Sequence, residues 1–205
     1  MKLLPCQTLL VVIAALFVAA LPGLAPWLIY DRQAILSGEI WRLFTSHWVH
    51  LSARHLALDV ISFAIVGGII ETRGLPRFGA LILVAPWAMG VAMLVFDPAM
   101  AFCAGLSGLA IAATVFLALS GLGDRSLWSW ACYLTLGAVA IKIAGQIAVG
   151  HPAFASIQGS PVVVAATTHL AGAVTALCFH ICFARKNCLN PLTGRDVKEL
   201  IIPSP

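Results

Sequence analysis

The chain has 205 residues, of which 61% are apolar and only 10% are charged. Soluble domains average about 45–50% apolar and about 25% charged residues, so the composition excludes a water-soluble fold and places the chain in lipid. We attribute the net charge of +4 to membrane topology and expect no nucleic-acid partner.

Stretches nearly free of charged residues recur along the whole chain. Each approaches the roughly 20 residues that a helix needs to cross about 30 Å of hydrocarbon. They are residues 3–21, 56–70, 78–96, 106–121, 127–149 and 162–184. Lipid-facing strands would instead alternate apolar and polar residues, and no stretch does so. We predict an all-α polytopic membrane protein, one domain over 1–205 with six transmembrane helices and a short irregular tail at 187–205.

Basic residues in the short loops predict the orientation of these helices. The residues that we assign to the cytoplasmic side are Lys2, Arg73, Arg77, Arg125, Arg185, Lys186, Arg195 and Lys198. The N-terminal stretch also imitates a signal peptide, but removing it would break the even number of spans. We therefore expect the first helix, 3–21, to be retained and both chain ends to be cytoplasmic.

The longest segment between predicted helices is 22–54, which is rich in amphipathic rings. Its Trp, Tyr and His residues are Trp27, Tyr30, Trp41, His47, Trp48 and His50. Such rings suit the headgroup level of a membrane. A connection of about 30 residues between membrane helices is unusual and often functional. We expect this loop to lie on or in the outer leaflet.

Several polar residues of the predicted spans fall at one depth, in the outer half of the bilayer. They are His55, Asp59, Ser107, Lys142, Gln146 and His169. Chemistry inside a membrane needs polar groups that can meet, and an intramembrane ionisable residue is a functional hypothesis by default. The shared depth is the first indication of a site.

Ser107 lies in Gly105-Leu106-Ser107-Gly108, at the predicted start of the fourth helix. A helix N-terminus offers unpaired N–H groups that would stabilise an oxyanion, and the flanking glycines leave the hydroxyl accessible. The alternative is a packing face of small residues. His169 is the possible base, since Gly172 would let its helix approach the fourth helix closely. The alternative for His169 is a histidine bonded to a backbone carbonyl.

These residues resemble the rhomboid family of intramembrane serine proteases. The resemblance covers about residues 37–185 and lies in the ordered set of motifs rather than in any one of them. Residues 41–59 resemble the family's first loop and second helix, which a Trp-Arg pair opens, and Glu71 resembles its acidic residue closing that helix. The GxSG at 105–108 and the His-x-x-Gly at 169–172 match the catalytic motifs.

The resemblance implies a six-helix fold and a catalytic dyad of Ser107 and His169. Ser107 would attack a peptide carbonyl, with His169 carrying the proton, and the Ser107 backbone N–H and His55 would line the oxyanion hole. Asp59 stands where the family has an oxyanion-binding asparagine. It would act there only if neutral, or if neutralised by a cation such as Lys142, with which we predict a structural pair.

A second departure is Ile111, where many relatives place an aromatic residue or a histidine that packs on the catalytic imidazole. Without it, His169 must be oriented by another group, and the candidates are Gln146 and a backbone group. An inactive rhomboid-like protein that binds and escorts membrane helices is therefore the alternative to a protease. We expect neither a metal nor a cofactor, since the chain contains no HExxH motif.

The small size of the chain resembles the bacterial rhombosortase branch, which is thought to process C-terminal Gly-Gly signals. A generic bacterial rhomboid has the same size. In either case the implied partner is a transmembrane protein substrate, cleaved near the outer leaflet. The implied location is a bacterial inner membrane, with the active site opening to the periplasmic side.

Overall fold

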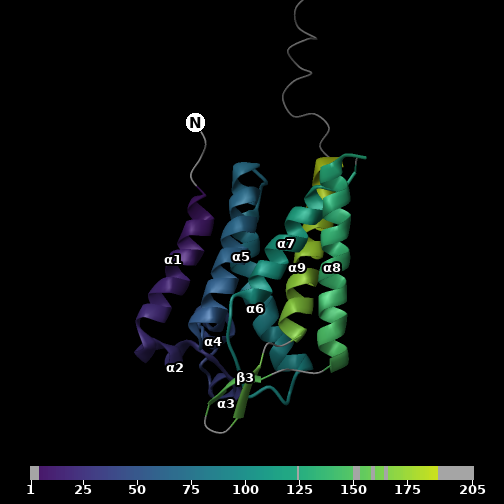
Figure 1. Ribbon diagram of the computed structural model, residues 1–205. Helices are drawn as coiled ribbons and strands as arrows, with labels where there is room; N and C mark the ends of the chain where they lie inside the picture. Colours follow the sequence, from purple (N-terminus) through teal and green to yellow (C-terminus); the bar gives the residue numbers. More distant parts are fainter. Residues whose placement is uncertain (1–4, 124, 150–152, 158–159, 164–165, 189–205) are drawn as a thin grey trace, which may run out of the picture.

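The fold is a bundle of apolar helices. The computed structural model describes residues 5–123, 125–149, 153–157, 160–163 and 166–188, with side chains to 148 and again over 166–182. The long helices of the bundle are α1 (Cys6–Ala20), α5 (Ala53–Thr72), α6 (Phe78–Phe96), α7 (Ser107–Ser120), α8 (Leu127–Val149) and α9 (Ala166–Cys188). Figure 1 shows them side by side along one direction. The helical membrane bundle expected from the sequence is confirmed, with a helix at each predicted apolar stretch.

The helices differ in how well they match the thickness of a bilayer. Among the described residues, α5, α6 and α8 are each long and apolar enough to cross a membrane, and α1 qualifies together with Pro22–Leu28, to which it is bent by 92°. Helix α7 has only 14 residues, about 21 Å at 1.5 Å per residue. It packs against α5, α6, α8 and α9, and most of its side chains are buried. An enclosed helix need not match the lipid, so α7 can begin inside the bundle (Figure 1).

The segment between α1 and α5 folds into short turns around a buried arginine. It contains η1 (Pro22–Leu24), α2 (Ala25–Leu28), β1 (Tyr30–Asp31), α3 (Arg32–Leu36), α4 (Arg42–Thr45) and η2 (Ser46–Trp48). The guanidinium of Arg42 donates to the carbonyls of Pro26 at 2.8 Å and Ile29 at 3.0 Å, and to Glu39 at 2.7 Å. Arg42 is only 5% exposed. Its bonds to the backbone carbonyls of Pro26 and Ile29 hold the loop in one shape.

A small sheet, which no pattern in the sequence indicates, lies at the same end of the bundle as this loop (Figure 1). Its strand order is β1, β2 (Phe102–Cys103), β4 (Ser160–Val163), β3 (Ala153–Ile157). Strand β2 pairs antiparallel with β1 and parallel with β4. Strands β1 and β2 have only two residues each, which is too short for an alternation of apolar and polar residues to be recognised. The sheet joins the loop before α5, the segment before α7 and the segment before α9.

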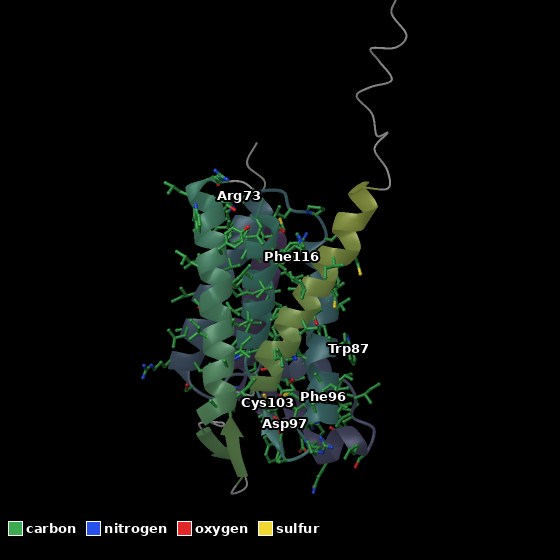
Figure 2. The ribbon with its side chains drawn as sticks, turned by 90° about the vertical axis from the view of Figure 1, so that its right-hand side faces the viewer. Arg73, Trp87, Phe96, Asp97, Cys103 and Phe116 are labelled. Atoms are coloured by element: carbon green, nitrogen blue, oxygen red, sulfur yellow. The ribbon has the colours of Figure 1, made fainter. Side chains whose placement is uncertain are left out.

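The opposite end of the bundle is fastened by an acidic residue. Glu71, near the end of α5, accepts hydrogen bonds from the backbone N–H groups of Gln7 at 3.0 Å and Thr8 at 2.6 Å, and from the Thr8 hydroxyl at 2.6 Å. A carboxylate at a helix N-terminus satisfies unpaired donors and complements the helix dipole. Figure 2 shows Arg73 at this end and Asp97 at the end that carries the sheet.

Candidate active site

Ser107 and His169 meet inside the bundle. Ser107 is the first residue of α7, and His169 is the fourth residue of α9. The Ser107 Oγ atom lies 2.9 Å from Nε2 of His169. The imidazole is completely buried, at 0% exposure. The two residues that the motifs singled out therefore form a hydrogen-bonded pair, which is the geometry that a nucleophile and its base require.

Gln146 orients the imidazole from α8. Its Oε1 atom lies 2.7 Å from Nδ1 of His169. An amide oxygen only accepts, so Nδ1 carries the hydrogen and the lone pair of Nε2 faces the Ser107 hydroxyl. Because Ile111 stands in place of the aromatic residue that orients the imidazole in many relatives, we expected Gln146 or a backbone group to orient His169. The structure shows that Gln146 forms this hydrogen bond.

Two glycines bring α7 and α9 together at the level of this pair. A Cβ added to Gly172 would lie 2.6 Å from the carbonyl oxygen of Gly108, and one added to Gly108 would lie 3.3 Å from that of Thr168. Gly172 could not carry a side chain unless the helices moved apart, and a side chain at Gly108 would first meet the flexible end of Met89. The predicted close approach of the fourth and sixth helices at Gly108 and Gly172 is confirmed.

The segment before Ser107 forms the other wall of the site. Gly105 has a φ of +126°, which side-chain-bearing residues rarely adopt. A Cβ on Gly105 would lie 2.6 Å from Cε1 of His55 and 3.3 Å from Oδ2 of Asp59. The backbone just before the Ser107 N–H thus lies directly against both side chains that the family resemblance associates with the oxyanion hole.

Asp59 has different partners from those expected. Its Oδ2 atom lies 3.2 Å from Nε2 of His50 and 3.1 Å from Nε2 of His55. Lys142 is exposed, and within the described part of the chain no ion pair joins it to Asp59. The predicted Asp59–Lys142 pair is therefore wrong: the two residues share a depth, but the Asp59 carboxylate is taken up by histidines of its own helix and of the preceding loop.

His50 is a member of this cluster that the sequence did not indicate. Its Nε2 atom accepts from the backbone N–H of Leu106 at 3.3 Å, and its Nδ1 lies 3.2 Å from the carbonyl oxygen of Trp48. His47, His50 and His55 have the spacing of metal ligands, but they lie in a loop and at a helix start, and their spacing does not indicate this cluster. No pattern in the sequence predicts a contact with Leu106, because it depends on how the loop folds back onto α7.

A cavity of about 590 Å³ gives access to these groups between α5, α7 and α8. It is lined by Ser107 and His169 together with His55, Asp59, Lys142 and Gln146, among others. The structure therefore brings all six predicted polar residues to one cavity.

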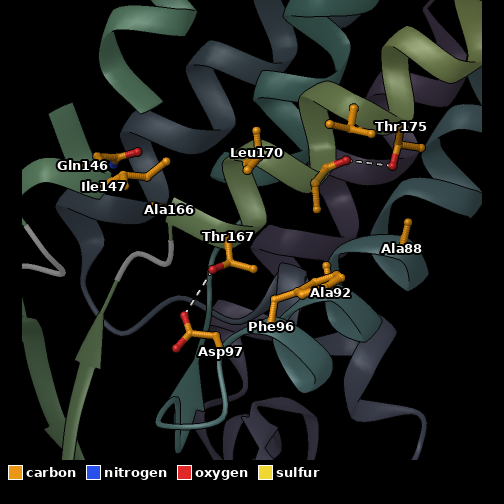
Figure 3. A pocket seen from close by; sticks show the side chains of 12 residues that line it. Ala88, Ala92, Phe96, Asp97, Gln146, Ile147, Ala166, Thr167, Leu170 and Thr175 are labelled. Carbon is orange, nitrogen blue, oxygen red and sulfur yellow. Dashed lines mark hydrogen bonds between the residues drawn. The ribbon is translucent and has the colours of Figure 1, made fainter. Parts of the chain in front are cut away.

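A second cavity, of about 560 Å³, lies between α6, α8 and the start of α9. Figure 3 shows its largely apolar wall, with Phe96, Ala92 and Leu170, and the hydrogen bond from Thr167 to Asp97. Gln146 lines both cavities. The Gln146 side chain therefore lies between the two cavities, next to the imidazole of His169.

Most of the chain matches one known protein family. The family model described as Rhomboid domain matches residues 37–186 of the chain. A search of curated proteins finds no match. The chain belongs to the rhomboid family of integral membrane proteins, whose members are generally intramembrane serine proteases and include inactive forms. The span of the match agrees with the 37–185 expected from the motifs.

Proposed function

We propose that the protein is an intramembrane serine endopeptidase that uses a dyad of Ser107 and His169. The observation that carries the proposal is the 2.9 Å contact between Ser107 Oγ and His169 Nε2, with Gln146 on the other ring nitrogen. Apolar residues could pack these membrane helices equally well. A serine, a histidine and an amide aligned in this way therefore point to a chemical role.

In this mechanism His169 takes the proton of Ser107 as the hydroxyl attacks a peptide carbonyl, and then gives it to the leaving amine. The oxyanion forms near the start of α7, where the Ser107 backbone N–H and His55 would stabilise it. A water molecule entering through the cavity would then hydrolyse the acyl-enzyme, with His169 again acting as base.

The substrate would be a transmembrane helix of another protein, unwound near the outer leaflet. We place the protein in a bacterial inner membrane, with both termini cytoplasmic and with the sheet-bearing end of the bundle facing the periplasm. The position of Ser107 at the start of α7, towards that end, supports cleavage near the periplasmic surface.

Labelling by a fluorophosphonate, which reacts with activated serines, tests the dyad. The wild-type protein is expected to be labelled, and both Ser107→Ala and His169→Ala are expected to abolish labelling. Ser62→Ala is the matched control, because Ser62 lines the same cavity, whereas His169 forms its hydrogen bond with Ser107. Labelling that persists in Ser107→Ala would exclude Ser107 as the nucleophile.

The second candidate is an inactive family member that binds and escorts membrane helices. It is favoured by Asp59, a carboxylate in the place of the oxyanion-binding asparagine. This candidate predicts that the folded wild-type protein is not labelled and that it co-purifies with a membrane helix. Labelling of the wild type that depends on Ser107 and His169 would exclude it.

The rhombosortase resemblance makes the substrate proposal more specific. A reporter protein ending in Gly-Gly, an apolar helix and a basic tail should be cleaved when it is co-produced with the wild-type protein. The control is the same reporter with Ala-Ala in place of Gly-Gly. Equal cleavage of both reporters would indicate a generic rhomboid specificity, whereas cleavage of neither would remove this class of substrate.

A further inference from the structure

The carboxylate of Asp59 lies next to the proposed oxyanion hole, where a negative charge would oppose the reaction. Asp59 borders Gly105, two residues before Ser107, and its side chain is only 9% exposed. An ionised, uncompensated carboxylate in such a place is costly to bury. It would also repel an oxyanion forming at the start of α7. The structure must therefore neutralise Asp59 by some means other than Lys142.

The contacts of His50 determine how many protons this cluster holds. The Trp48 carbonyl oxygen can only accept, so the Nδ1 atom of His50, 3.2 Å away, must carry a hydrogen. The Nε2 atom then faces two groups, Oδ2 of Asp59 at 3.2 Å and the N–H of Leu106 at 3.3 Å. The contact between Nε2 and Oδ2 is attractive only if a proton lies between them.

Two arrangements satisfy this requirement. If the proton is on Asp59, the neutral carboxyl donates to Nε2 of His50, which also accepts from Leu106. If it is on Nε2, an imidazolium faces a carboxylate, and Nε2 no longer accepts from the N–H of Leu106. Both arrangements contain one proton, and both leave the pair of Asp59 and His50 with no net charge.

We propose that Asp59 and His50 share one proton, and that this proton keeps the oxyanion hole free of negative charge. The proposal rests on the proposed function and concerns the same site. Asp59 and His50 are positioning residues in it: they hold His55 and Leu106 in place without touching the substrate. Loss of the shared proton would leave a negative charge beside the developing oxyanion and would stop the reaction.

Other ionisable groups face the same cluster and must be separated from it in a test. Those that line the cavity are Arg54 and His55 of α5, Lys142 of α8 and His169 of α9. His47 of η2 lies behind Gly105, against its backbone. Deprotonation of His169 favours attack, and the amine of Lys142 is a second basic group on the same cavity. Lys142→Gln is therefore the control for an alkaline change.

The first test measures the rate of fluorophosphonate labelling between pH 6 and pH 10 in detergent micelles. The wild-type rate should fall at high pH, by about tenfold per pH unit once the shared proton is lost. This fall should remain in Lys142→Gln and disappear in Asp59→Asn, whose amide has no proton to lose in this range. A fall of equal size in Asp59→Asn, or no fall in the wild type, would overturn the proposal.

The second test is a charge rescue at pH 7. His50→Gln can still donate to Asp59 but cannot share a titrating proton, so Asp59 stays ionised and labelling should slow at least about tenfold. Adding Asp59→Asn removes the charge and should restore most of the rate. A purely structural role for His50 predicts instead that the double variant is no faster than His50→Gln, which would overturn the proposal.

The two proposals can fail separately. If the folded wild-type protein is not labelled at any pH, the proposed protease function fails. If labelling depends on Ser107 and His169 but shows neither the Asp59-dependent alkaline fall nor the rescue, Ser107 remains the nucleophile and only the shared proton is wrong. Thermal unfolding of each variant identifies any that do not fold, and the two tests use different single variants.

Discussion

The amide oxygen of Gln146 lies 2.7 Å from Nδ1 of His169, on the side of the imidazole opposite Ser107. This contact selects the tautomer in which Nε2 can accept the serine proton. Gln146→Leu removes the acceptor and lets the ring rotate or hold its hydrogen on Nε2. We expect the rate of fluorophosphonate labelling to fall on the order of tenfold to a hundredfold, because a wrongly held tautomer disables the base.

Gln146→Glu is the matched variant, since it keeps an acceptor oxygen at the same reach. It should retain much more activity than Gln146→Leu. Equal rates for the wild type and Gln146→Leu would show that a different group orients His169.

Gly105 allows a prediction that separates backbone strain from contact with the site. Gly105 and Gly123 have nearly the same φ, +126° and +127°, but a Cβ would meet His55 only at Gly105 and nothing within 4 Å at Gly123. Alanine at either position should lower the stability of the protein by about 1–3 kcal/mol, because a residue with a side chain is strained at this φ. Only Gly105→Ala should also slow labelling, because it displaces His55. Equal labelling by the two variants would place His55 outside the oxyanion hole.

The positions of the helices could be predicted from the sequence, because apolar length is a property of consecutive residues. Each of the six apolar stretches became a helix, from Cys6–Ala20 to Ala166–Cys188. The bilayer requires every backbone group to be satisfied within such a stretch, so little else could form there. The fold of the loop before α5 and the small sheet could not be predicted, since they depend on Arg42 and on pairings between distant segments.

The Ser107–His169 pair could be predicted, because its motifs contain glycines that let the two helices pack closely. Gly108 and Gly172 indicated the contact that joins Ser107 to His169. Asp59 shows the limit of the same reasoning: its depth could be counted along α5, but the direction of its side chain could not. Depth alone suggested Lys142, whereas the folded loop supplies His50.

The contact between α7 and α9 predicts that Gly172 tolerates no side chain. In Gly172→Ala the new Cβ would lie 2.6 Å from the Gly108 carbonyl oxygen, so the helices must separate. Such overpacking typically costs about 1–3 kcal/mol, and here it should also lengthen the Ser107–His169 contact and slow labelling. Gly137→Ala in α8 is the control, because its Cβ would meet nothing within 4 Å. A Gly172→Ala protein as stable and reactive as the control would contradict this packing.

His47 makes the stability of the loop depend on pH. Its Nε2 atom donates to the carbonyl oxygen of Pro86 at 3.1 Å, and complete burial lowers the pKa of His47 from 6.5 to about 4. Between these values the unfolded chain binds the proton and the folded chain does not, so stability falls as the pH is lowered through this window. The full loss is about 3 kcal/mol, from about 1.4 kcal/mol per unit of pKa.

Thermal unfolding in detergent at pH 4.5 to 7.5 measures this effect. His47→Gln can keep the bond to Pro86 but cannot titrate, so its melting temperature should decrease less than that of the wild type as the pH falls. The remaining histidines are the same in both proteins and cancel in the comparison. Parallel curves for the two proteins would mean that His47 is protonated in the fold as readily as in the unfolded chain.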